Sequence, residues 1–166
     1  FLPSSCINQI EMFQEDTFNM EDITKEISWA KGIGFNTLRV YLHDLLWKEK
    51  DQFLIRFNDF LDCCKRFEIK PIIVLFDDCH YPFPELGPQP LPVRGIHNSG
   101  WKQSPGHQIV TEIFELNAEQ HLKRLQSYTQ ELLELHKEDE RILMWDLYNE
   151  PGQFGMGEKS YTFLKN

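Results

Sequence analysis

The segment Trp145-Asp146-Leu147-Tyr148-Asn149-Glu150-Pro151 is the most informative part of this sequence for the fold. Residues 141–148 are typical of a β-strand, in which side chains point alternately to the two faces. One face of this strand is apolar and carries Leu143, Trp145 and Leu147. The other face gains charge toward the carboxyl end, through Met144, Asp146, Tyr148 and Glu150. Such a strand can pack under helices on one side and face a binding site on the other.

Residues 37–42 repeat this two-faced pattern. Leu38, Val40 and Leu42 share the apolar face, and Arg39, Tyr41 and His43 share the polar one. Burying Arg39 and Asp146 under a helix is costly unless they pair, so we expect an ion pair between them. A barrel whose inner wall forms the floor of an active site explains the pattern better than a sheet covered by helices on both faces.

The rest of the chain alternates between strand-like and helix-like segments. Strands are predicted at residues 6–13, 37–42, 71–76 and 141–148. A helix capped by Asn19 is predicted to end near residue 31, another spans residues 51–67, and a third begins at Asn117. Strands that alternate with helices indicate an α/β fold with parallel strands and right-handed crossovers.

Residues 77–110 interrupt this alternation with a loop rich in proline and glycine. Loops of this length inside compact domains are usually functional, and this one directly follows a strand. It therefore lies at the carboxyl edge of the sheet, where parallel α/β proteins place their chemistry. Its aromatic and histidine side chains argue against the alternative, an inserted linker.

Composition excludes several classes of function. The 166 residues include 17 Lys and Arg against 26 Asp and Glu, a net charge of -9. So acidic a chain is a poor binder of nucleic acid phosphates, and no apolar run is long enough to span a membrane. The four cysteines form no CxxC pair, so we expect free thiols and assign no metal ligand and no cofactor.

Four short segments carry a resemblance to a known family. They are Asn149-Glu150-Pro151 at a strand end, Asn36-Thr37-Leu38-Arg39-Val40, Val74-Leu75-Phe76-Asp77 and His97-Asn98-Ser99-Gly100-Trp101. Together they resemble clan A glycoside hydrolases, most nearly glycoside hydrolase family 5 and its cellulase-like relatives, including bacterial proteins described as 1,4-β-xylanases. The resemblance runs from about residue 2 to residue 151. It implies a (β/α)8 TIM barrel, of which residues 1–166 would form about the first four βα units in a single catalytic domain.

The resemblance also implies an activity and its residues. By this likeness Glu150 is the general acid/base of a retaining β-glycosidase, Asn149 binds the sugar 2-hydroxyl and Arg39 supports the site. The nucleophile is expected on a later strand. The substrate would be a β-linked polysaccharide or oligosaccharide of glucan, mannan or xylan type, and a secreted or periplasmic location follows from the resemblance alone. Further candidates for substrate binding are His43, Asp77, Trp101 and Tyr148.

Two other functions remain open on the sequence. One is a half-barrel that binds sugar without cleaving it. The other is a metal-dependent TIM-barrel hydrolase, whose ligands would come from His43, Asp44, Asp77, Asp78, His80 and His97. Neither HxH nor HExxH occurs, so the metal alternative has no supporting spacing. Open edges of the first and fourth strands also predict self-association.

Overall fold

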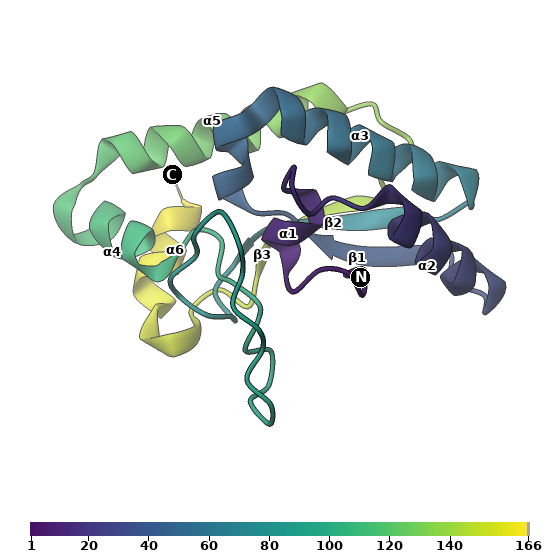
Figure 1. Cartoon of the computed structure of the whole chain (residues 1–166). Helices are drawn as coiled ribbons and strands as arrows, with labels where there is room; N and C mark the ends of the chain where they lie inside the picture. The colour runs from purple at the N-terminus through teal and green to yellow at the C-terminus, as the bar shows by residue number, and fades with distance from the viewer. Residues whose placement is uncertain (166) are drawn as a thin grey trace.

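The computed structural model describes residues 1–165 as an α/β domain built on a small parallel sheet (Figure 1). Its strands are β1 (Thr37–Tyr41), β2 (Lys70–Asp77) and β3 (Met144–Asn149). The α-helices are α1 (Gln9–Phe13), α2 (Met20–Gly32), α3 (Lys50–Arg66), α4 (His107–Leu116), α5 (Glu119–His136) and α6 (Gly157–Leu164). Two short 3-10 helices, η1 (Asp44–Glu49) and η2 (Gln153–Gly155), follow β1 and β3.

The sheet has the order β1-β2-β3, and both pairs of neighbouring strands are parallel. Val40 of β1 lies opposite Ile73 of β2, which in turn lies opposite Trp145 of β3. The predicted parallel arrangement is therefore confirmed. Because strands of the same direction end on the same side, the carboxyl ends of all three strands meet at one edge.

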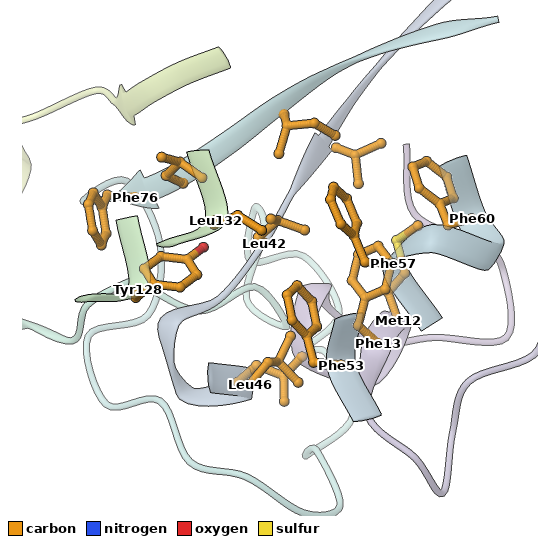
Figure 2. Close-up of a cluster of buried hydrophobic side chains, with 14 of the residues drawn as sticks. Met12, Phe13, Leu42, Leu46, Phe53, Phe57, Phe60, Phe76, Tyr128 and Leu132 are labelled. Atoms are coloured by element: carbon orange, nitrogen blue, oxygen red, sulfur yellow. The ribbon is translucent and has the colours of Figure 1, made fainter. Parts of the chain in front are cut away.

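Helices α3 and α5 lie along one face of the sheet (Figure 1). Beneath them, Val40, Ile73 and Leu75 are fully buried. Aromatic side chains fill the rest of this core, and Figure 2 places Phe13, Phe53, Phe57, Phe60, Phe76 and Tyr128 within it. The opposite face is more open, since Met144 of β3 is 52% exposed. The predicted apolar face of β1 is covered by helices. On the predicted apolar face of residues 141–148, however, Leu143 and Leu147 are 46% and 52% exposed, so the two-faced pattern holds for β1 and only in part for β3.

The predicted TIM-barrel half, with four βα units, is wrong. The described residues form three strands, and residues 6–13 do not form the first strand of a barrel. Instead Gln9–Phe13 is helix α1, begun by Asn8, whose side chain accepts hydrogen bonds from the backbone N–H groups of Ile10 and Glu11. Every residue of α1 is buried, and Gln9 and Glu11 alternate with Ile10 and Met12 as they would along a strand. A segment this short cannot be assigned to strand or helix from that pattern.

Two asparagines were expected to begin helices, and one of them does. Asn19 caps α2 by accepting from the backbone N–H groups of Glu21 and Asp22. Asn117 instead ends α4, with a left-handed backbone at φ 49° and ψ 45°. Asparagine suits both positions, because it caps helix starts and also tolerates the left-handed region. The long loop is slightly shorter than predicted. It ends at residue 106, because α4 begins at His107.

The four cysteines are free, as predicted, with Cys6, Cys63 and Cys64 buried and Cys79 partly exposed. Among residues 1–165, none of the helices combines the length and the hydropathy that crossing a bilayer requires.

Phe13 shows how α1 is held in the core. Its ring makes edge-to-face contacts with Phe53, Phe57 and Phe60 of α3, with ring centroids 5.8, 5.9 and 5.7 Å apart. We expect Phe13→Ala to lower the free energy of unfolding by about 3–5 kcal/mol, because it removes a buried aromatic ring and leaves a cavity. Urea denaturation measures the change. Phe35→Ala is the matched control, since Phe35 is 51% exposed and should cost far less. Equal losses in the two variants would contradict the placement of α1.

An ion-pair network joins the turn before β3 to α3. Arg141 donates to both carboxylate oxygens of Asp139, to Asn58 Oδ1 at 2.7 Å and to Asp62 Oδ1 at 2.7 Å. The hydrogen bonds from Arg141 hold the pKa of Asp139 well below its usual range. The Asp139 side chain is only 13% exposed, so solvent screens this pair weakly.

We therefore expect Asp139→Asn to destabilise the protein by about 2 kcal/mol at pH 7. A carboxyl whose pKa is lowered by folding stabilises the protein above its unfolded pKa, which is about 3.9. The difference between variant and wild type should thus shrink as the pH falls below about 4. Urea denaturation at several pH values tests this, with the exposed neighbour Glu140→Gln as control. A difference that is independent of pH would contradict the role of the Asp139 charge.

Candidate active site

The polar side chains predicted to be functional gather at the carboxyl edge of the sheet. Strand β1 ends at Tyr41, β2 at Asp77 and β3 at Asn149, with Glu150 directly after it. Asp77 and Asn149 are register partners on neighbouring strands. The edge therefore brings together residues that are far apart in the sequence.

Asn149 connects all three strands through its side-chain amide. Its Oδ1 accepts a hydrogen bond from Arg39 Nη2 of β1 at 3.0 Å. Its Nδ2 donates to Asp77 Oδ1 of β2 at 2.6 Å. Asn149 is 7% exposed and Asp77 1% exposed, so the hydrogen bond between them is shielded from water, whereas the Arg39 side chain is 41% exposed. An amide nitrogen carries two hydrogens, and one of them remains for a ligand.

Arg39 also forms the expected ion pair with Asp146. Its Nε donates to Asp146 Oδ2 at 3.1 Å, and its Nη2 donates to the same oxygen. Its remaining terminal nitrogen, Nη1, donates to the Tyr41 hydroxyl at 2.8 Å. Burial raises the pKa of Tyr41 to about 12, so this phenol keeps its own proton at neutral pH and can donate it in turn. The guanidinium is thus held in one orientation by three partners.

Three rings form a cluster beside Asp77, made of Tyr41, His80 and Trp101. His80 Nδ1 lies 2.5 Å from Asp77 Oδ2, which orients the imidazole. The Trp101 indole stacks on His80, with centroids 5.3 Å apart and an interplanar angle of 27°, and meets Tyr41 edge-on at 5.3 Å. This cluster places an aromatic surface at the carboxyl edge, with Trp101 partly exposed.

Glu150 is the exposed carboxylate of this edge. Its backbone is left-handed, with φ 45°, and Gln153 Nε2 donates to its Oε2 at 3.2 Å. The thiol of Cys79 is hydrogen-bonded to Glu150, and burial together with this hydrogen bond raises the pKa of Cys79 to about 11. The thiol is therefore protonated at neutral pH and lies against the carboxylate expected to be catalytic.

Asp78 fixes the segment that follows Glu150. This carboxylate is fully buried and accepts hydrogen bonds from the Tyr148 hydroxyl at 2.8 Å, from the Gly152 N–H at 2.7 Å and from the Ser160 hydroxyl. The Asp78 N–H in turn donates to the Asn149 carbonyl at 3.2 Å. One side chain after β2 thereby joins the end of β3 to helix α6.

Two candidate substrate-binding residues lie away from this open edge. His43 is fully buried, with Nε2 2.7 Å from the Gln103 carbonyl and Nδ1 accepting from the Leu45 N–H at 3.2 Å. Burial lowers the pKa of His43, so its ring is neutral and Nε2 is the donor. Tyr148 is 9% exposed, and its ring packs against Phe76 and Phe163.

The long loop returns to the sheet and covers these residues. Ser104 forms an antiparallel bridge with Asp77 at the end of β2, and Lys102 pairs with Tyr81. Gln103 Nε2 donates to the Asp78 carbonyl at 2.6 Å. This return brings Trp101 to the site and buries His43, which sequence alternation alone had placed beside Arg39 and Tyr41.

The structure thus brings together Arg39, Asp77, Trp101, Asn149 and Glu150. Of the ligands considered for a metal-dependent hydrolase, Asp77 and His80 are adjacent, whereas Asp44 bonds to Ser104 and Arg124 in a separate buried network and His97 is exposed. Cys79 was missed, because a single cysteine outside any CxxC pair gives no signal in the sequence.

Comparisons with known proteins add no assignment. The chain matches no protein-family model, and neither the curated proteins nor the solved structures contain a significant match to it.

Replacing Asp78 should loosen the segment that carries Glu150. Asp78→Asn offers one acceptor oxygen to three donors, so at least one buried donor loses its partner. We expect the free energy of unfolding to fall by about 1–3 kcal/mol and amide exchange in residues 150–160 to accelerate. Urea denaturation and hydrogen exchange measure the two effects. The control is Asp59→Asn on the exposed side of α3. Unchanged exchange in residues 150–160 would contradict the anchoring role.

Proposed function

We propose that the carboxyl edge of the sheet is the acid/base and substrate-binding part of a retaining β-glycoside hydrolase, with Glu150 as general acid/base. The observation that carries the proposal is the bridged Asn149, held between Arg39 and Asp77 next to the exposed Glu150. The resemblance of Asn149-Glu150-Pro151 and of the Arg39 strand to clan A glycoside hydrolases supports the same roles.

The chemistry fits these residues. A glycosidic oxygen is a poor leaving group and needs a proton as its bond breaks, which a carboxylic acid at the site supplies. The free amide hydrogen of Asn149 is placed to bind a sugar hydroxyl, an interaction that strengthens in an oxocarbenium-like transition state. Arg39 keeps that amide oriented, and the partly exposed Trp101 offers a ring face for stacking.

A retaining mechanism needs a second carboxylate about 5–5.5 Å from the first. The other carboxylates of this network are engaged, since Asp77 is held by Asn149 and His80, and Asp146 by Arg39. We therefore assign the nucleophile to neither of them. Because both carboxylates already have partners, a second candidate function is favoured, in which the edge binds β-linked sugars without cleaving them.

Sugar binding tests what both functions share. Gluco-, manno- and xylo-oligosaccharides with β-linkages are titrated while tryptophan fluorescence is recorded. We expect at least one series to bind, Asn149→Ala and Trp101→Ala to weaken binding at least about tenfold, and the exposed His97→Gln to leave it unchanged. Absence of binding by every series would overturn both candidate functions.

Residues 1–166 alone are not expected to hydrolyse glycosides, because they lack an assigned nucleophile. In a protein that joins this edge to its nucleophile, Glu150→Gln separates cleavage from binding. The substitution keeps the shape of the side chain and removes its proton, so hydrolysis of natural β-glycans should fall by about 10²–10⁴-fold. Aryl glycosides with good leaving groups need no acid, so they should still form the glycosyl-enzyme, and azide should speed its turnover to a β-glycosyl azide. Product analysis by NMR checks the configuration. Full activity of Glu150→Gln on a natural polysaccharide would contradict the acid/base role. Sugar binding without any hydrolysis by the wild type would favour the binding function.

A further inference from the structure

The residues directly after β2 bring three different metal-binding groups together. A carboxylate oxygen of Asp77, the thiol of Cys79 and a ring nitrogen of His80 all lie within 4.8 Å of one another. Asp77 and His80 are buried, whereas Cys79 is partly exposed. The group is therefore held by the protein on one side and reachable from solvent on the other.

The donor set selects a class of cation. Ca²⁺ and Mg²⁺ take oxygen ligands, so a thiol and an imidazole argue against them. Thiolate, imidazole and carboxylate are the ligands of Zn²⁺, which takes four of them at tetrahedral positions. Around one Zn²⁺ ion such ligands stand roughly 3.3–3.8 Å apart, given bond lengths of 2.0–2.3 Å. Ligand atoms that stand 4.8 Å apart must therefore approach by about 1 Å to share one ion.

Three protein ligands leave one tetrahedral position of Zn²⁺ open to water. The carboxylate of Glu150 is exposed at the same edge. The nearby carboxylates Asp77, Asp78 and Glu150 outweigh the single guanidinium of Arg39, which Asp146 already neutralises. A divalent cation would therefore meet a negative environment.

We propose that Asp77, Cys79 and His80 form a Zn²⁺ site whose fourth position is open to solvent. The 2.5 Å separation of His80 Nδ1 and Asp77 Oδ2 is shorter than the spacing of two ligands on one ion, so the ion takes the place of the proton between them. The imidazole keeps one proton, which moves to Nε2. The Asn98 amide, whose Nδ2 lies 3.5 Å from Nε2, then turns its carbonyl oxygen toward the ring to accept a hydrogen bond from it. The Cys79 thiol loses its proton to solvent as the sulfur–metal bond forms, and no electron is transferred.

The inference does not rest on the proposed function, because it needs only binding of an ion. Cobalt(II) is the probe, since it takes the place of Zn²⁺ and reports a thiolate ligand through a charge-transfer band in the near ultraviolet. Titration of the purified protein with Co²⁺ should produce this band, and one equivalent of Zn²⁺ should remove it.

Single-residue variants identify the ligands. Cys79→Ser should abolish the band and weaken Zn²⁺ binding at least about tenfold, and His80→Gln should weaken it to a similar degree. Glu150→Gln should retain the band with reduced affinity. The controls are Cys6→Ser, a buried thiol elsewhere, and His97→Gln, an exposed histidine of the same loop. Circular dichroism confirms that each variant is folded.

The outcomes distinguish this inference from the proposed function. Absence of the band in the wild type, or its persistence in Cys79→Ser, would overturn the metal site whatever the sugar measurements give. A band that depends on Cys79 and His80 in a protein that binds no sugar would support the metal site and contradict only the proposed function.

Discussion

The position of the Asn149 amide is the constraint on which the whole edge depends. The Asn149 amide accepts a hydrogen bond from Arg39 and donates one to Asp77, so one side chain of β3 fixes the polar groups of β1 and β2. Asn149 and Asp77 are buried, whereas the Arg39 side chain is 41% exposed. A buried polar group without its partner costs more than the hydrogen bond contributes. Loss of Asn149 or Asp77 therefore leaves the other one unpaired, and the geometry of the site and the stability of the sheet edge are coupled.

A second layer of contacts reaches the same edge from the loops. Asp78 gathers donors from β3, from the turn after it and from α6, while Gln103 and Ser104 return the long loop to the end of β2. Such hydrogen bonds restrict the orientation of the loop residues that they anchor. This explains how Glu150, which lies outside the regular strand, keeps a defined place beside Cys79 and Asn149.

Sequence patterns predicted the strands of the sheet but not the barrel. Alternation identified Arg39 and Asp146 as partners across 107 positions, since both lie on the polar faces of two-faced strands. It failed for residues 6–13, where a fully buried single helical turn has the same apolar character as a strand. It also failed for His43, because burial there comes from Gln103 of the returning loop, a long-range contact with no periodic signal. Cys79 lies beside Asp77 and His80 because of the turn that follows β2. Its part in the proposed metal site therefore depends on backbone geometry, which the composition does not reveal.

The backbone at Glu150 carries an evolutionary consequence. Its φ of 45° lies in the region that glycine and asparagine tolerate best, and the following Pro151 restricts it further. Drift under selection for stability alone would replace such a glutamate, since glycine at this position relieves strain of roughly 1–2 kcal/mol. Keeping a glutamate there costs stability, so its retention requires selection for a property other than folding. Laboratory evolution of this protein for heat resistance should therefore favour replacement of Glu150, unless activity is selected at the same time.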